Sequence, residues 1–174
     1  MSVINKCLFP VAGYGTRFLP ATKAIPKEML PILTKPLIQY GVEEAMSAGM
    51  STMTMVTSKY KQAIKNHFEP NTDIEASIKG TAKASLLDEV NYASEQCEFT
   101  YIEQQQMLGL GHAIFTGKPL IGNEPFAVIL PDDLCTNSTD SVLMQMTKLY
   151  AQHPDCCIVA IEEVPMVDVD KYGV

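Results

Sequence analysis

Short apolar runs alternate along the chain with longer stretches in which apolar residues recur every three or four positions. The short runs predict strands, and they span residues 7–11, 53–57, 99–102, 126–130 and 156–161. Every residue of 126–130 is apolar, which is typical of a strand covered on both faces.

The amphipathic stretches predict helices over 36–48, 60–68, 74–90 and 142–150, with a short helix opening at 112–115. Pro36 suits a first helical turn, Gly49 a helix end, and Pro154 stops the last helix. The four-residue spacing of apolar positions in 74–90 predicts one continuous helix despite Gly80.

This order of strands and helices predicts the α/β class: a Rossmann-like, mostly parallel sheet with helices on both faces. The length of 174 residues indicates one domain, spanning 1–174. Only a short tail follows the run at 156–161, and it ends at Tyr172-Gly173-Val174 without a capping element. We therefore expect the domain to be incomplete at its C-terminus.

Composition narrows the classes of partner. Acidic residues exceed basic ones, with a net charge of −7, which argues against nucleic-acid or anionic-membrane binding. No apolar run approaches the roughly 20 residues that a membrane span needs. The five cysteines form no CxxC pair and lie among apolar residues, so we expect buried, reduced thiols and a cytoplasmic location.

In open α/β sheets ligands bind beyond the carboxyl ends of the strands, so the residues after each predicted strand are the candidates. After 7–11 come Ala12 and the segment Gly13-Tyr14-Gly15-Thr16-Arg17, then Lys23 and the Pro-Lys-Glu run at 26–28. After 99–102 and 126–130 come Gln104, Gly109 and the pair Asp132-Asp133. This set of glycines, amides, cations and carboxylates fits a nucleoside triphosphate with a divalent metal.

The segment Gly13–Arg17 has the strongest phosphate-binding character. Glycines allow close backbone approach, and successive N–H groups form an anion-binding nest. Arg17, Lys23 and Lys27 add positive charge, Arg17 in a bidentate geometry. Neither the Walker spacing nor the dinucleotide fingerprint is present, because Phe18 holds the third glycine position. The alternative is a glycine turn followed by a solvated basic loop.

Two further groups have weaker signals when they stand alone. Asp132 after a buried strand could hold Mg²⁺, although an Asp pair there also starts a turn or caps a helix. Gln104 and the glycines at 109 and 111 could read a base edge, since an amide offers donors and acceptors in one plane. We interpret His112 as a packing or capping residue.

The segment Val11 to Pro36, VAGYGTRFLPATKAIPKEMLPILTKP, resembles the signature of bacterial UTP–glucose-1-phosphate uridylyltransferases, within the sugar-nucleotide pyrophosphorylase superfamily. The resemblance continues through LIQY at 37–40, LLDEV at 86–90, MLGLGHA at 107–113, VILPDD at 128–133 and YGV at 172–174. It covers essentially the whole chain in order. The A-G-x-G-T-R form points to the uridylyl branch rather than the thymidylyl or adenylyl branch.

The resemblance implies a reaction and roles for individual residues. UTP and glucose 1-phosphate would give UDP-glucose and pyrophosphate, with Mg²⁺ as cofactor and a homo-oligomer when full length. Arg17 and Lys27 would be catalytic and bind the triphosphate, Asp132 would ligate Mg²⁺, and Gly173 would lie beside the glucose ring. The nucleotide would be bound by Ala12, Gly13, Gly15, Thr16, Glu28, Gln104 and Gly109.

Two departures from the family pattern leave alternatives open. Glu103 stands where the family usually has an arginine, and family members continue beyond residue 174 with a Glu-Lys-Pro segment and a second metal-binding aspartate. We expect very low activity if this chain is the entire molecule. The alternatives are a non-catalytic nucleotide-binding regulatory subunit and a thymidylyl or adenylyl sugar-1-phosphate transferase.

Overall fold

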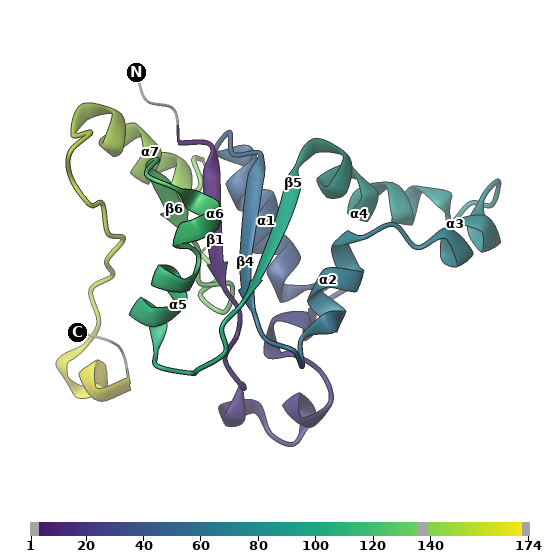
Figure 1. The fold of residues 1–174 in the computed structure, drawn as a ribbon, viewed down its shortest axis with the longest axis horizontal. Helices are drawn as coiled ribbons and strands as arrows, with labels where there is room; N and C mark the ends of the chain where they lie inside the picture. Colours follow the sequence, from purple (N-terminus) through teal and green to yellow (C-terminus); the bar gives the residue numbers. More distant parts are fainter. Residues whose placement is uncertain (1–3, 136–138, 172–174) are drawn as a thin grey trace.

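The computed structural model describes residues 4–135 and 139–171, and a four-stranded sheet lies at its centre (Figure 1). The strands β1 (Lys6–Pro10), β4 (Thr52–Thr57), β5 (Glu98–Glu103) and β6 (Phe126–Val128) lie in the order β5-β4-β1-β6. Every pair of neighbours is parallel. The chain builds outward from β1 to β4 and β5 and then returns to place β6 on the other side. The strand order therefore reverses between β1 and β6.

Helices cover both faces of this sheet. On one face the core includes residues of α1 (Leu37–Ser47), α2 (Gln62–Phe68), α4 (Ala84–Gln96) and α7 (Val142–Gln152). On the other face it includes residues of α5 (Leu110–Thr116) and α6 (Lys118–Ile121). The remaining elements are α3 (Thr72–Ile78), the hairpin β2 (Pro31–Ile32) and β3 (Lys35–Pro36), and the 3-10 turns η1 (Thr16–Phe18), η2 (Ala21–Lys23), η3 (Lys27–Met29) and η4 (Met166–Lys171). The predicted α/β fold class is confirmed.

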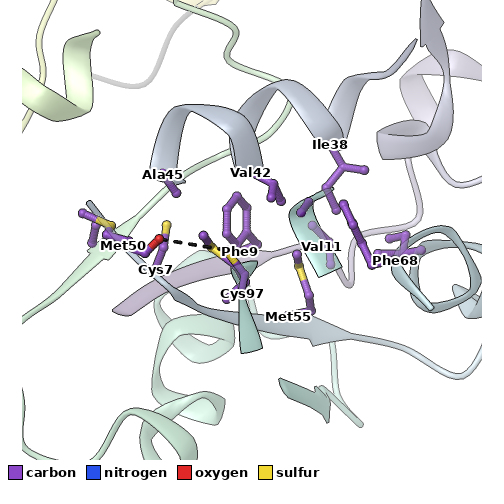
Figure 2. Close-up of a cluster of buried hydrophobic side chains, with 14 of the residues drawn as sticks. Cys7, Phe9, Val11, Ile38, Val42, Ala45, Met50, Met55, Phe68 and Cys97 are labelled. Atoms are coloured by element: carbon purple, nitrogen blue, oxygen red, sulfur yellow. Dashed lines mark hydrogen bonds between the residues drawn. The ribbon is translucent and has the colours of Figure 1, made fainter. Parts of the chain in front are cut away.

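The larger core lies between the sheet and α1. Alternate residues of β1 (Cys7 and Phe9) and Val11 just beyond it point toward the buried face of α1, where Ile38 and Val42 meet them (Figure 2). Each fully buried side chain of this size contributes about 1.5–3 kcal/mol relative to an exposed one. This packing fixes the end of β1, from which the candidate phosphate-binding loop departs.

On the opposite face, a glycine lets the helical layer approach the sheet. A Cβ at Gly117, between α5 and α6, would lie 2.2 Å from Cδ1 of Leu8 in β1. Any larger residue would have to displace the buried Leu8 side chain. The close approach anchors α5 against β1, and α5 carries His112.

The prediction of a single helix over 74–90 is wrong. The structure has two helices, α3 and α4, separated by a turn at 79–83. Gly80 in that turn has a φ of +79°, a left-handed conformation that ends a helix and favours glycine. The apolar spacing continues across the turn, so periodicity alone did not reveal the break.

The predicted strand at 156–161 is also wrong. Its residues form no strand, and Val159 and Ile161 are 70% and 93% exposed. In Figure 1 the segment runs irregularly from α7 to η4. A strand requires a neighbour to pair its backbone N–H and C=O groups, and this segment pairs with none of the described strands. The predicted strand 126–130 exists but ends at Val128.

The expectation of buried thiols is correct for Cys7 and Cys97 and wrong for Cys135, Cys156 and Cys157, which are exposed. Burial raises the pKa of the Cys7 thiol and keeps it protonated. Among the described helices, none has the length and apolar character needed to cross a membrane.

Candidate functional site

The loop after β1 folds back on itself beyond the carboxyl edge of the sheet. Gly15 has a φ of +66°, and its carbonyl oxygen accepts a hydrogen bond from Thr22 Oγ1 at 2.7 Å. A Cβ at Gly15 would lie only 3.1 Å from Cβ of Lys27. Glycine is therefore required here on two counts, and the fold of the loop places Lys27 beside the Gly15 turn.

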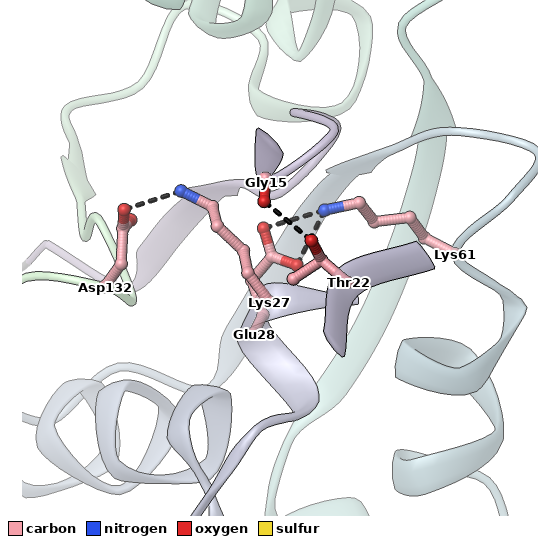
Figure 3. A network of polar contacts seen from close by, with 6 residues as sticks. All are labelled: Gly15, Thr22, Lys27, Glu28, Lys61 and Asp132. Carbon is pink, nitrogen blue, oxygen red and sulfur yellow. Dashed lines mark hydrogen bonds and ion pairs between the residues drawn. The ribbon is translucent and has the colours of Figure 1, made fainter. Parts of the chain in front are cut away.

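Lys27 bridges the two sides of the point where the strand order reverses. Its Nζ donates to Oδ2 of Asp132 at 2.5 Å, and Asp132 follows β6 whereas Lys27 lies in the loop after β1 (Figure 3). Both side chains remain partly exposed to solvent. In open α/β sheets this reversal is the position at which ligands bind. The ion pair therefore brings together the cation that the sequence predicts for phosphate binding and the carboxylate that it predicts for metal binding.

Beneath this pair lies a buried ion pair between Glu28 and Lys61. Lys61 Nζ donates to both carboxylate oxygens of Glu28, at 2.8 and 2.6 Å, and the two side chains are 0% and 6% exposed (Figure 3). Burial raises the pKa of Glu28 and lowers that of Lys61, and the opposite charge beside each group works against its shift. The pair connects the start of α2 to η3 and so holds Lys27 in position.

The predicted base-reading residue lies at the end of β5. The Gln104 side chain is buried, and its backbone N–H donates to the carbonyl oxygen of Thr57 at 2.8 Å, extending the ladder to β4. Its Nε2 lies 2.8 Å from Nδ1 of His112 and 3.5 Å from the carbonyl oxygen of Gly109. Gly109 has a φ of +93° and directly precedes α5. The glutamine is thus held in place from two sides.

Glu103 lies at the end of β5. Its backbone is paired in register with Thr57 at the end of β4, and its side chain is exposed. The pKa of Lys59 is raised, chiefly by its contact with Tyr60, with smaller contributions from Tyr14 and Glu103. No ion pair joins Glu103 to Lys59 in the part of the chain that the structure describes, so the Glu103 charge acts on Lys59 only at longer range.

The other predicted site residues occupy the same edge of the sheet. Ala12 is buried directly after β1, whereas Gly13, Thr16 and Arg17 are exposed on the loop that follows. Among the described residues, none forms a hydrogen bond or ion pair with the Arg17 guanidinium. Gly173 lies outside the described residues.

Two residues of the site were missed by the sequence analysis. Lys61 lies in the loop after β4. The rule that ligands bind beyond the carboxyl ends of strands points to this loop when it is applied to β4. His112 was interpreted as packing or capping, but its ring contacts the amide of Gln104. The eight-residue separation of these two side chains gives no pattern that would have revealed the contact.

The donor set suits Mg²⁺ bound together with a phosphate. Mg²⁺ prefers oxygen ligands and usually takes one or two carboxylates, with waters and substrate phosphates completing its shell. Asp132 and Asp133 supply carboxylates of this kind at the sheet edge. Among the described residues there is no cluster of three or more acidic, His or Cys side chains placed to bind a metal ion unaided.

Comparison with known proteins agrees with this geometry. The UTP–glucose-1-phosphate uridylyltransferase of Pseudomonas aeruginosa is 57% identical over 173 residues, which are 99% of this chain and 62% of that protein. The crystal structure of apo UDP-glucose pyrophosphorylase is 59% identical, with a TM-score of 0.92, over 98% of this chain and 63% of that chain. A UDP-glucose pyrophosphorylase complexed with UDP-glucose is 56% identical, with a TM-score of 0.84, over 98% of this chain and 62% of that chain.

The chain thus spans somewhat less than two thirds of the length of these relatives. The model of the nucleotidyl transferase family matches residues 10–174, and the chain therefore belongs to that family.

Proposed function

We propose that this chain is the nucleotide-binding part of a UTP–glucose-1-phosphate uridylyltransferase. The reaction joins UTP and glucose 1-phosphate to give UDP-glucose and pyrophosphate. The observation that carries the proposal is the 2.5 Å contact between Lys27 Nζ and Asp132 Oδ2 across the strand reversal. It brings together the two kinds of group that a metal-bound triphosphate needs. The choice of UTP as the nucleotide and of glucose 1-phosphate as the sugar phosphate follows the names of the similar proteins.

In this reaction an oxygen of the sugar phosphate attacks the α-phosphorus of UTP in line, and pyrophosphate leaves from the opposite side. Such a transfer needs positioning and charge neutralisation rather than a covalent nucleophile. Arg17 and Lys27 bind the triphosphate and offset the charge that shifts onto the leaving pyrophosphate. Gly13, Gly15 and Thr16 bring backbone N–H groups close to the phosphates.

Asp132 would hold Mg²⁺ in the proposed complex. The bound ion would draw charge from the phosphate oxygens and so make the α-phosphorus easier to attack. In the free protein Lys27 is paired with Asp132. Binding of the metal and the triphosphate together would replace this ion pair with two others, Lys27 with the phosphates and Asp132 with the metal.

Uracil would lie against Ala12 and Gly13, with Gln104 and Gly109 completing its recognition. Glu28, which is buried and paired with Lys61, would support the nucleoside side of the site from beneath. Gly173 would lie beside the glucose ring, as the family resemblance implies. We further propose a cytoplasmic enzyme that forms a homo-oligomer when full length.

The proposal is tested by calorimetric titration of the chain with UTP in the presence of Mg²⁺, with ATP and dTTP as controls. We expect UTP to bind more tightly than either control, and the affinity to fall when Mg²⁺ is removed. Equal binding of the three nucleotides by a folded protein would contradict the assignment of the base site. A circular dichroism spectrum taken beforehand establishes that the protein is folded.

A further inference from the structure

The side-chain amide of Gln104 is held in one orientation by two neighbours. Its Nε2 lies 3.5 Å from the carbonyl oxygen of Gly109, which can only accept a hydrogen bond. The amino end of the amide must therefore face Gly109, because the oxygen end would place two acceptors against each other. The same Nε2 lies 2.8 Å from Nδ1 of His112.

These contacts use both protons of the Gln104 amino group. His112 then accepts at Nδ1. The oxygen Oε1 of Gln104 has no hydrogen-bond partner among the residues that the structure describes. The side chain therefore presents an acceptor, and no donor, to whatever binds at the end of β5.

We propose that His112 is a positioning residue that sets the base preference of the site, by holding Gln104 with its amide oxygen toward the ligand. This inference rests on the proposed function, since it assigns the cause of uracil selection at that same site. The pairing edge of uracil carries an N–H donor at N3, whereas cytosine has a lone pair there. An amide oxygen that faces the ligand attracts the N3–H of uracil and repels the N3 lone pair of cytosine.

If the amide turned over, the preference would reverse. The amino group would then face the ligand and donate to N3 of cytosine, while it would meet the N3–H of uracil donor against donor. The contact to Gly109 decides which end of the amide faces it, but it is long, at 3.5 Å, so the shorter contact to His112 Nδ1 supplies most of the strength that holds this orientation. Removing the ring would therefore allow both orientations and weaken the discrimination between the two pyrimidines.

Three variants separate this role from simple support of α5. His112→Leu removes the acceptor, whereas His112→Asn restores one, because Oδ1 of asparagine and Nδ1 of histidine are both bonded to Cγ. Phe115→Ala truncates an exposed side chain one turn away on the same helix. The measurement is the ratio of the dissociation constants of CTP and UTP with Mg²⁺ for each folded variant.

We expect the CTP-to-UTP ratio to fall about tenfold in His112→Leu, the size of one lost hydrogen bond, and to stay near the parent value in His112→Asn and Phe115→Ala. An unchanged ratio in folded His112→Leu would overturn the inference while leaving the proposed function intact. If His112→Leu does not fold, a lost preference in folded His112→Asn would overturn it equally. A parent protein that does not prefer UTP over CTP would instead contradict the proposed function itself.

Discussion

Replacing Lys61 by methionine would leave the Glu28 carboxylate buried without its counter-charge. Lys61 Nζ contacts both oxygens of that carboxylate, at 2.8 and 2.6 Å, and Glu28 is fully buried. Methionine fills a volume similar to that of the lysine stem but donates no hydrogen bond. The change therefore removes charge compensation with little change in packing.

Removing one partner of a buried ion pair costs about 3–5 kcal/mol, because the remaining charge is stranded away from water. We expect Lys61→Met to lower the free energy of unfolding by this amount at pH 7. A matched control is Lys65→Met in α2, the helix that Lys61 directly precedes, because the exposed contact of Lys65 with Glu69 is 3.4 Å long. An exposed pair of this kind contributes at most about 1 kcal/mol.

The stability lost in Lys61→Met should depend on pH, and the burial of Glu28 determines the sign of that dependence. Burial already raises the pKa of Glu28, and removing Lys61 takes away the main influence that lowers it. An acid whose pKa is higher in the folded state destabilises that state increasingly as pH rises above its unfolded value, about 4.3. The deficit of Lys61→Met should therefore shrink as pH falls from 7 toward 5.

Urea unfolding followed by circular dichroism at pH 7 and pH 5 measures both effects. The double variant Glu28→Gln with Lys61→Met should recover much of the loss, since no charge is then left buried. A deficit below about 1 kcal/mol, or one that is the same at both pH values, would refute the reasoning.

Three other changes test the loop and the metal site. Gly15→Ala should lower the free energy of unfolding by more than about 1 kcal/mol, since it combines a left-handed backbone with a Cβ only 3.1 Å from Lys27. Gly80→Ala has the same backbone strain but open space around the new Cβ, so it should cost only about 1 kcal/mol, and urea unfolding compares the two. Asp132→Asn should change the free energy of unfolding by under about 1 kcal/mol and abolish the Mg²⁺ dependence of UTP binding. Calorimetry with and without Mg²⁺ measures this dependence, and its persistence in the variant would contradict the choice of Asp132 as the metal ligand. Arg17→Ala should weaken UTP binding about tenfold and Arg17→Lys less; equal UTP affinity of Arg17→Ala and the parent would show that the guanidinium does not reach the phosphates.

The sequence predicted four of the strands, because apolar runs are a local pattern. The apolar runs at 7–11, 53–57 and 99–102 correspond to β1, β4 and β5. The rule that ligands bind beyond the carboxyl ends of strands pointed to Lys27 and Asp132, and the structure brings these two side chains into contact. One failure is local, the break at Gly80 within the predicted helix, and the other depends on pairing between distant segments. The run at 156–161 has the composition of a strand but pairs with none of the described strands.

The contacts that organise the site were not predictable in the same way. The sequence around Glu28 is typical of an exposed polar loop. The side chain is buried because the fold places it against Lys61, 33 residues away. His112 lies in the first turn of α5, which begins at Leu110 rather than at the predicted position 112, and its contact with Gln104 is determined by where β5 ends and α5 begins. Pairing between buried polar groups depends on tertiary geometry, and periodicity carries no information about it.

The most direct test of the central claim is to map where UTP binds, by recording amide chemical shifts of the isotopically labelled chain during a titration with UTP and Mg²⁺. The account predicts shifts confined to the loop after β1, the segment around Gln104 and Gly109, and the residues around Asp132. Shifts centred on the groove between α1 and α4, with these three segments unaffected, would contradict it.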